Sequence, residues 1–379
     1  MFLKLPKLNF DWKKILSYLS VVSVFFISAF VTYLFLSNGK APATNSSESP
    51  AYAEKVKDEE NFDPEKPFNI LLLGYGGEGH EGGSLSDVLM VVHVSPQEKK
   101  VVLISIPRDT WVELPVRSDI KEFHKINYAH AIGSDDTKYP LKEPQFKGSI
   151  GGGELAKYAL EKVTGLPMHF FLSVDFNGFK RIVDDLGGID VNVPVTFDDY
   201  YYPIKGAENL SCGKSEEEIA ALSATMSGFI LEKEFQCRYE HLRFEKGVVP
   251  MDGETALKFV RSRHSDEHGG DFARSERQYS LLKSLLGKAI SLNALTKWPE
   301  LFDQFARLVK TDLNKDVIKL VVGEGLDLSE YKVFTLQLST ENVFKETKSQ
   351  DGQYILVPKA GSGNWDEMHN FIKLQLERF

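Results

Sequence analysis

The sequence has few cysteines and no excess of positive charge. Its 379 residues include two cysteines and no C-x-x-C pair, which argues against a cysteine zinc site or a dithiol redox motif. Lysine and arginine number 45 against 54 aspartates and glutamates, so the formal net charge is −9. Proteins that bind nucleic acids usually carry a basic excess, so we expect no nucleic acid partner. A local basic pocket for a phosphate is still compatible with this composition.

Several motifs of common enzymes are absent or incomplete. Gly74, Gly76 and Gly79 match G-x-G-x-x-G, but the loop leads to a second strand pattern, not to the helix that a dinucleotide site requires. No G-K-[ST] follows, and His264 and His268, although four residues apart, lie in a Gly-rich loop and do not form an H-E-x-x-H motif. Ser105 and Ser173 lie in strand patterns without a nucleophile elbow. The sequence therefore does not support a nucleotide-binding protein, a zinc protease or a serine hydrolase.

One long uncharged run stands near the N-terminus. Residues 15–39 carry no charged side chain, and roughly 20 apolar residues suffice to cross a bilayer. Four lysines precede the run and only Lys40 follows it closely, which places the N-terminus in the cytoplasm. The alternative is a cleaved signal peptide, whose apolar region would be shorter, although the APA at 41–43 resembles a cleavage site. The sequence favours a single-pass anchor, with the remaining chain outside the membrane.

The rest of the chain shows the pattern of an α/β protein. Strand patterns mixed with helical patterns predict a mixed central β-sheet flanked by helices on both faces. The C-terminal segment either completes this sheet or forms a small appended domain. The predicted parts are a cytoplasmic tail (1–14), a transmembrane helix (15–37), a polar linker (38–66), a catalytic domain (67–291) with an irregular insertion (about 198–249), and a C-terminal α/β extension (292–379).

The two cysteines fall in the insertion. Cys212 and Cys237 flank a single polar stretch, and an extracytoplasmic location permits disulfides. We therefore expect a local disulfide between them, with two free thiols as the alternative.

Two aspartates lie at the ends of neighbouring strand patterns. Asp87 opens the strand DVLMVV, and Asp109 follows the strand VVLIS. Mg²⁺ prefers one or two carboxylates together with substrate phosphate oxygens, and two strand ends can supply such a pair. The alternative is that both are ordinary turn residues. Asp87 and Asp109 are therefore candidate ligands of Mg²⁺ as a cofactor.

Arginines recur in the same part of the sequence. Arginine binds phosphate through two parallel hydrogen bonds, which favours a phosphate site over surface salt bridges in so acidic a chain. Arg261 and Arg263 would share one side if the chain is extended there, whereas Arg277 could be exposed or in contact. Asp271 is the expected N-cap of the helix that carries Arg274 and Gln278. The remaining candidates for phosphate binding are Arg108 and Lys125.

Six blocks together resemble a known family. They cover residues 68–291 and match, in order, the motif blocks of the LytR–CpsA–Psr family: SDVLMVVHV, LISIPRDTWV, HKINYAHA, FNGFKRIVDDLGGIDVNVP, MDGETALKFVRSRH and DFARSERQ. The resemblance implies a Mg²⁺-dependent transferase at the outer face of the cytoplasmic membrane. Such an enzyme takes a glycopolymer from a polyprenyl-pyrophosphate carrier and joins it to peptidoglycan. The chain departs from the family pattern at Ala273, where glycine is usual, and in its longer insertion.

The resemblance also implies roles for single residues. Asp87 and Asp109 match the metal-site aspartates, and the other matching positions bind the pyrophosphate. These positions are Arg108, Lys125, Arg261, Arg263, Asp271, Arg274 and Gln278. Arg108, Asp87 and Asp109 are the catalytic candidates, and Asp109 is the candidate proton acceptor. Residues 170–174 and the apolar face after Gln278 either line a groove for the polyprenyl chain or, as we favour, form core. Other possible functions are a non-catalytic wall-binding or regulatory protein and a polyprenyl-pyrophosphate pyrophosphatase.

Overall fold

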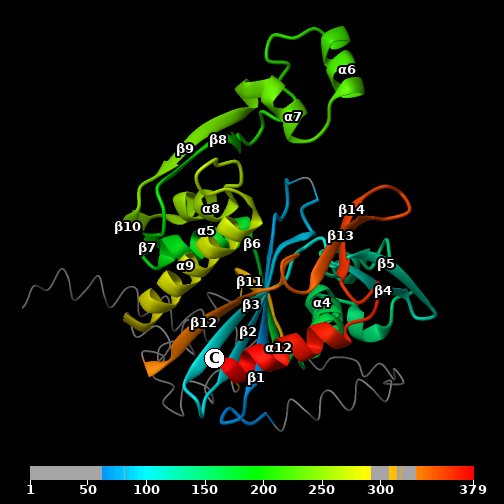
Figure 1. Cartoon of the computed structure of the whole chain (residues 1–379), viewed down its shortest axis with the longest axis vertical. Coiled ribbons are helices and arrows are strands. Elements are labelled where there is room, and N and C mark those ends of the chain that lie inside the picture. Colours follow the sequence, from blue (N-terminus) through cyan, green and yellow to red (C-terminus); the bar gives the residue numbers. More distant parts are fainter. Residues whose placement is uncertain (1–61, 81, 292–306, 314–316, 318–329) are drawn as a thin grey trace, which may run out of the picture. The chain divides into compact units, whose positions relative to one another are not determined.

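A mixed six-stranded β-sheet organises the chain. The computed structural model describes residues 62–80, 82–291, 307–313, 317 and 330–379. The strand order is β11-β6-β1-β2-β3-β12, in which β1–β6 and β3–β12 are parallel and the other pairs antiparallel. The strands are β1 (Phe68–Tyr75), β2 (Ser86–Ser95), β3 (Lys100–Ser105), β6 (Phe170–Asp175), β11 (Val309–Thr311) and β12 (Lys332–Gln337). The predicted mixed central sheet is therefore present (Figure 1).

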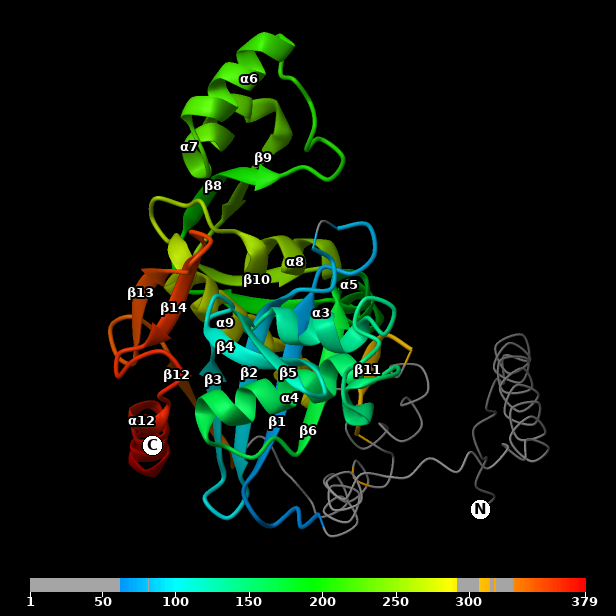
Figure 2. The same cartoon turned by 90° about the vertical axis from the view of Figure 1, so that its right-hand side faces the viewer.

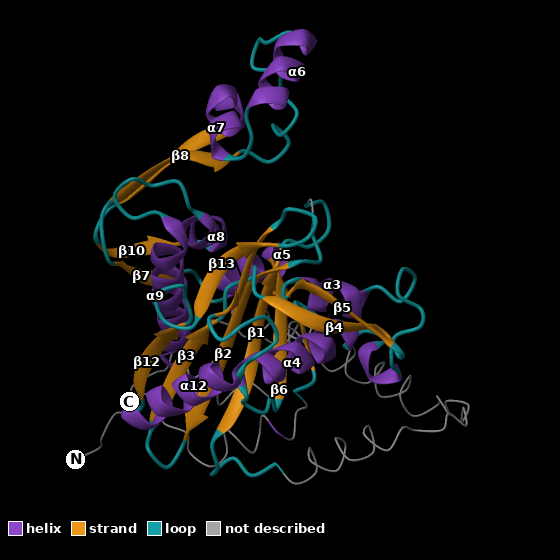
Figure 3. Ribbon diagram, turned by 45° about the vertical axis from the view of Figure 1, so that its right-hand side comes forward, coloured by secondary structure: helices purple, strands orange, loops and turns teal. Residues whose placement is uncertain are grey.

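Helices cover both faces of this sheet because its strands alternate two sets of apolar residues. Leu71 and Val91 pack with α3, α4 and α12 on one face, whereas Met90 and Leu103 pack towards α9 on the other. Figure 3 shows these helices around the central strands. The helices are α3 (Tyr128–Ser134), α4 (Gly151–Thr164), α5 (Phe176–Asp185), α8 (Gly253–Arg261), α9 (Gly270–Ser291) and α12 (Asp366–Arg378). Smaller elements on the first side are β4 (Trp111–Arg117), β5 (Ile120–Lys125), η1 (Pro144–Phe146), β13 (Phe344–Lys348) and β14 (Tyr354–Pro358).

The glycines that begin α4 permit unusually close packing. A Cβ atom on Gly153 would lie 2.2 Å from the ring of Phe171 in β6. A Cβ atom on Gly133 of α3 would lie 2.2 Å from the carbonyl oxygen of Gly151. Any larger residue at Gly133 or Gly153 would push α3 or strand β6 away from α4, since neither the aromatic ring nor the backbone can yield by that much.

The C-terminal part of the chain completes the same sheet. β11 pairs with β6 and β12 pairs with β3, so two of its strands occupy the two edges of the sheet. A buried ion cluster fastens the first of these segments, because Lys157 of α4 contacts both Asp312 and Glu154. Asp312 also accepts the backbone N–H of Phe171 at 2.8 Å. Of the two alternatives that the sequence left open, the structure shows completion of the sheet.

The predicted insertion is a structured arm rather than an irregular segment. We call residues 197–244 the arm. Its two strands form an antiparallel hairpin, and its helices lie between them in sequence (Figure 2). The arm comprises β8 (Phe197–Pro203), α6 (Glu216–Thr225), α7 (Phe229–Glu232), η2 (Lys233–Arg238) and β9 (Tyr239–Phe244). Its base is flanked by a second small sheet, in which β7 (Ile189–Val193) pairs with β10 (Gly247–Met251). The expectation of irregular structure was wrong because regular strands here alternate with polar turns.

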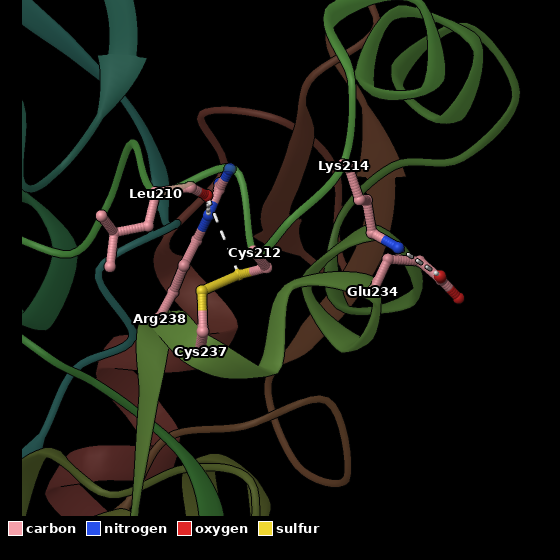
Figure 4. Close-up of a disulfide and its surroundings, with 6 residues drawn as sticks. All are labelled: Leu210, Cys212, Lys214, Glu234, Cys237 and Arg238. Carbon is pink, nitrogen blue, oxygen red and sulfur yellow. Dashed lines mark hydrogen bonds and ion pairs between the residues drawn. A yellow bond between two sulfur atoms is a disulfide. The ribbon is translucent and has the colours of Figure 1, made fainter.

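The far part of the arm has almost no core. Between residues 204 and 238 the buried residues are Ala207 and Phe235, and neither α6 nor α7 buries a side chain. A disulfide joins Cys212 to Cys237 (Figure 4). The guanidinium of Arg238 lies 3.8 Å from the centre of the Phe235 ring. A module with so little apolar burial depends on such a covalent link for its order.

The predicted membrane anchor at 15–37 lies outside the described residues, as do the tail and most of the linker. No helix in the described part of the chain has the length and apolar character needed to cross a bilayer.

Replacing both cysteines should disorder the end of the arm alone. In a Cys212→Ser, Cys237→Ser variant, we expect residues 204–238 to become sensitive to proteases, since closing a loop of this size contributes about 3 kcal/mol. Limited proteolysis with mass spectrometry would locate the cuts, and Ser211→Ala is a control that retains the disulfide. An arm equally resistant in the double variant and the wild type would contradict this prediction.

Candidate functional site

A pocket of about 640 Å³ lies between the second face of the sheet and helices α5, α8 and α9. Six of the residues predicted to form the site line it together, although they are far apart in sequence: Asp87, Arg108, Arg261, Arg263, Arg274 and Gln278. Most of the remaining wall is apolar. The structure thus brings the charged residues and an apolar cavity into one site.

Charged and apolar residues are separated along helix α9. Arg274, Gln278, Leu281, Leu282 and Leu285 all line the pocket, at the spacing of one helix face. The rise of an α-helix places Leu285 about 16 Å from Arg274. The pocket therefore has a polar end at the beginning of α9 and an apolar end further along the helix.

The sheet supplies the opposite apolar wall. Leu172 and Val174 of β6 line the pocket, whereas their strand neighbours Phe171 and Ser173 are buried away from it. This alternation follows from the two-residue period of a strand. Residues 170–174 therefore contribute alternately to the core and to the cavity wall, and the binding of a polyprenyl chain there stays a prediction.

Two carboxylates contact a single guanidinium at the end of the sheet where β2 begins and β3 finishes. Arg108 Nη1 contacts Asp87, and its Nε lies 3.7 Å from a carboxylate oxygen of Asp109. Lys125 Nζ donates to Asp109 at 2.7 Å. Asp109 and Lys125 adjoin Arg108 but do not line the pocket itself. All four side chains are partly exposed, so they can exchange these partners for a ligand.

Backbone hydrogen bonds explain why these groups converge. The N–H of Ser86 donates to Asn127 O, and the N–H of Asn127 donates to Arg108 O. The N–H of Ile126 donates to Thr110 O at 2.7 Å. The K-I-N block is thereby bound both to the start of β2 and to the turn after β3, which sets Lys125 beside Asp109.

Arg261 is held against aromatic rings. Its guanidinium lies 4.5 Å from the centre of the Phe176 ring, and Nη1 donates to the hydroxyl of Tyr202 at 3.1 Å. Burial raises the pKa of that hydroxyl, so it stays protonated at neutral pH. Arg261 is the last residue of α8, and Arg263 follows in a loop. The two arginines therefore do not lie on one extended segment, yet both line the pocket.

Helix α9 begins at Gly270, so Asp271 is not its N-cap as predicted. The side chain of Asp271 lies outside the described part of the structure.

The sequence left Arg277 undecided, and the structure buries it completely. Sequence reasoning also missed Asp199, a pocket residue with no exposed surface, because it belongs to the segment treated as an irregular insertion. A single aspartate followed by three tyrosines matches no motif that would have indicated its role.

The donor set fits Mg²⁺ only with a phosphate ligand. Asp87 and Asp109 reach a common guanidinium, so they can face a common ligand. The described residues contain no cluster of three or more His, Cys, Asp or Glu suited to a metal. Two carboxylates with open positions suit an ion that keeps water and phosphate oxygens around it, not a closed protein cage.

Comparisons with known proteins identify the family of the chain. The family model of the LytR_cpsA_psr family matches residues 33–365. The chain belongs to this family. Among curated relatives, the teichoic acid transferase TagU of Enterococcus faecalis is 27% identical, and the match covers 70% of this chain and 68% of TagU. TagV of Bacillus subtilis is 29% identical, with 71% of this chain and 54% of TagV covered.

Solved structures share the fold. The crystal structure of B. subtilis TagV superposes with a TM-score of 0.52 at 25% identity, covering 83% of this chain and 98% of that one. TagT bound to LI-WTA superposes with a TM-score of 0.50 at 22% identity, covering 83% and 92%.

Filling the apolar end of the pocket should exclude an alkyl chain. We expect Leu285→Trp to weaken binding of decyl phosphate about tenfold, because displacing two methylene groups from the cavity costs about 1.6 kcal/mol. Isothermal titration calorimetry would measure the dissociation constant, with the exposed Leu374→Trp as a matched control on α12. Unchanged affinity in Leu285→Trp would place the alkyl chain elsewhere.

Proposed function

We propose that this protein transfers a glycopolymer, such as a teichoic acid or capsule, from a polyprenyl-pyrophosphate carrier to peptidoglycan. The observation that carries the proposal is one cavity with an apolar end and an end lined by four arginines and Asp87. The names of the curated relatives TagU and TagV describe the same chemistry for those proteins. We further propose that residues 15–37 anchor the chain, with the pocket at the outer face of the cytoplasmic membrane.

The two ends of the pocket suit the two halves of the donor. The polyprenyl chain would lie against Leu172, Val174 and the leucines of α9, because apolar surface is driven out of water. The diphosphate would lie between Arg108, Arg263 and Arg274, whose planar guanidinium groups match phosphate oxygens. This orientation directs the glycan out of the pocket towards the arm.

Asp87 and Asp109 are the residues that would hold Mg²⁺. The bound ion would neutralise charge on the diphosphate oxygens. Without it, Arg108 and Lys125 neutralise the two carboxylates. These same cations become available to the phosphate when the carboxylates take another partner.

The reaction replaces the phosphoanhydride bond of the diphosphate by a phosphodiester bond to peptidoglycan. An acceptor hydroxyl oxygen of peptidoglycan attacks the phosphorus that bears the glycan, and the bond from this phosphorus to the bridging oxygen breaks. Polyprenyl phosphate leaves with that oxygen, and the hydroxyl proton passes to a base, for which Asp109 is the candidate. The arginines stabilise the charge on both phosphates, and such positioning supplies most of the catalysis in phosphoryl transfer.

Removing a single charged group from this site should slow transfer. We expect Arg108→Ala and Asp109→Ala each to lower release of polyprenyl phosphate about a hundredfold, the usual effect of losing one electrostatic contact to a transition state. The full-length protein would be assayed with a lipid-pyrophosphate glycan and peptidoglycan oligomers. Arg181→Ala, an exposed arginine of α5 that does not line the pocket, is the matched control. Normal rates in both site variants would refute the assignment.

Chelation should stop transfer but leave lipid binding. Since Asp87 and Asp109 are the proposed ligands, EDTA should abolish product formation and added Mg²⁺ should restore it. Mass spectrometry of the products separates the alternatives. Transfer gives a glycan phosphate esterified to peptidoglycan, a pyrophosphatase gives the free glycan phosphate, and a binding protein gives no product.

A further inference from the structure

A loop of seven residues carries part of the cationic site between two buried groups of opposite charge. Residues 262–268 join α8 to the segment before α9, and they contain Arg263 and His264, which line the pocket. Asp199 comes from the arm and Arg277 from α9. Both have no exposed surface, although a buried charge is costly unless it is satisfied.

Asp199 binds the first half of this loop. One carboxylate oxygen accepts the hydroxyl of Ser262 at 2.6 Å, the N–H of Arg263 at 3.0 Å and the N–H of His264 at 3.2 Å. The other oxygen accepts the N–H of Tyr201 at 2.9 Å, within the arm itself. A single side chain therefore fixes the backbone of Arg263 relative to strand β8.

Arg277 binds both ends of the loop. Its Nη2 donates to the carbonyl oxygen of Ser262, and its Nη1 donates to the carbonyl oxygen of His268 at 2.7 Å. The same Nη1 lies 3.2 Å from His268 Nδ1, and because arginine only donates, this nitrogen is the acceptor. His268 Nε2 then donates to Glu276 of α9 at 2.9 Å. The guanidinium also lies 4.8 Å from the centre of the Phe197 ring at the base of the arm.

Burial lowers the pKa of Arg277 to about 10, and nearby Asp199 opposes this decrease. The group therefore remains charged at neutral pH. A lysine could not replace it, because a compact ammonium lacks the planar fork that reaches two carbonyl groups at once.

We propose that Asp199 and Arg277 are positioning residues that clamp residues 262–268 and thereby aim Arg263 at the diphosphate. The inference rests on the proposed function, since it assigns the diphosphate to the polar end of the pocket. Asp199 belongs to β8, so the clamp also couples the arm to the cationic site. Neither group needs to touch the substrate, since each acts through the loop between them.

The test compares a charged and an uncharged ligand of the same chain length. Farnesyl diphosphate needs both ends of the pocket, whereas farnesol needs only the apolar end. In full-length protein, below the melting temperature of each variant, we expect Asp199→Asn and Arg277→Met to weaken farnesyl diphosphate binding about tenfold. Farnesol binding should stay within twofold of wild type. Arg277→Lys should not restore the diphosphate affinity, which separates the two-carbonyl bridge from a requirement for charge alone.

Lys157→Met provides the matched control. Lys157 is another buried cation in an ion cluster, with the Phe171 ring 5.8 Å away, but it does not line the pocket. We expect it to lower thermal stability without changing either affinity. Hydrogen exchange should show faster exchange of residues 262–268 in the Asp199 and Arg277 variants only.

The outcomes distinguish the two proposals. If wild-type protein binds farnesyl diphosphate no better than farnesol, the diphosphate site fails, and the proposed function fails with it. If wild-type protein discriminates and the Asp199 and Arg277 variants discriminate equally well, the clamp alone is refuted. The clamp is refuted as well if Lys157→Met weakens diphosphate binding as much as Arg277→Met.

Discussion

Holding several guanidinium groups in one cavity is the constraint on which this site depends. Four arginines line the pocket, and like charges at such proximity repel one another in an interior of low dielectric constant. Four acidic residues line the same cavity, namely Asp87, Asp175, Asp199 and Glu232. Asp175 and Asp199 also accept backbone N–H groups. The acids therefore balance the arginines, and Asp199 also fixes the backbone of Arg263.

The central sheet determines where this balance can be reached. β2 starts at the same end of the sheet at which β3 finishes, because the two strands are antiparallel. Asp87 and Arg108 consequently lie side by side although a hairpin separates them in sequence. The helices on the second face bring Arg261 and Arg274 to that end of the sheet. Apolar side chains of the same helices line the rest of the cavity. One boundary between charge and hydrocarbon thus runs through the cavity, as an amphiphilic ligand requires.

The sequence predicted the sheet and most of the charged site for a simple reason. Strand and helix periods in the first part of the chain are strong, and the six blocks that carry Asp87, Arg108 and Arg274 lie on those elements. The arm was mistaken for irregular structure because α6 and α7 bury no side chain and show no clear period. Asp199 was missed and Arg277 was left undecided for another reason. Their role arises from contacts between distant segments, and single-residue chemistry does not reveal which charges a fold will bury.

The position of β12 has a consequence for how this protein is made. This strand pairs with β3, and Lys332 lies opposite Lys100. Because these residues are far apart in sequence, the two strands emerge from the ribosome at very different times. Until the last part of the chain appears, β3 offers unpaired backbone groups that can associate with another chain. Parallel pairings between distant segments also form slowly. A nascent chain would therefore gain from a chaperone that shields this edge until synthesis is finished.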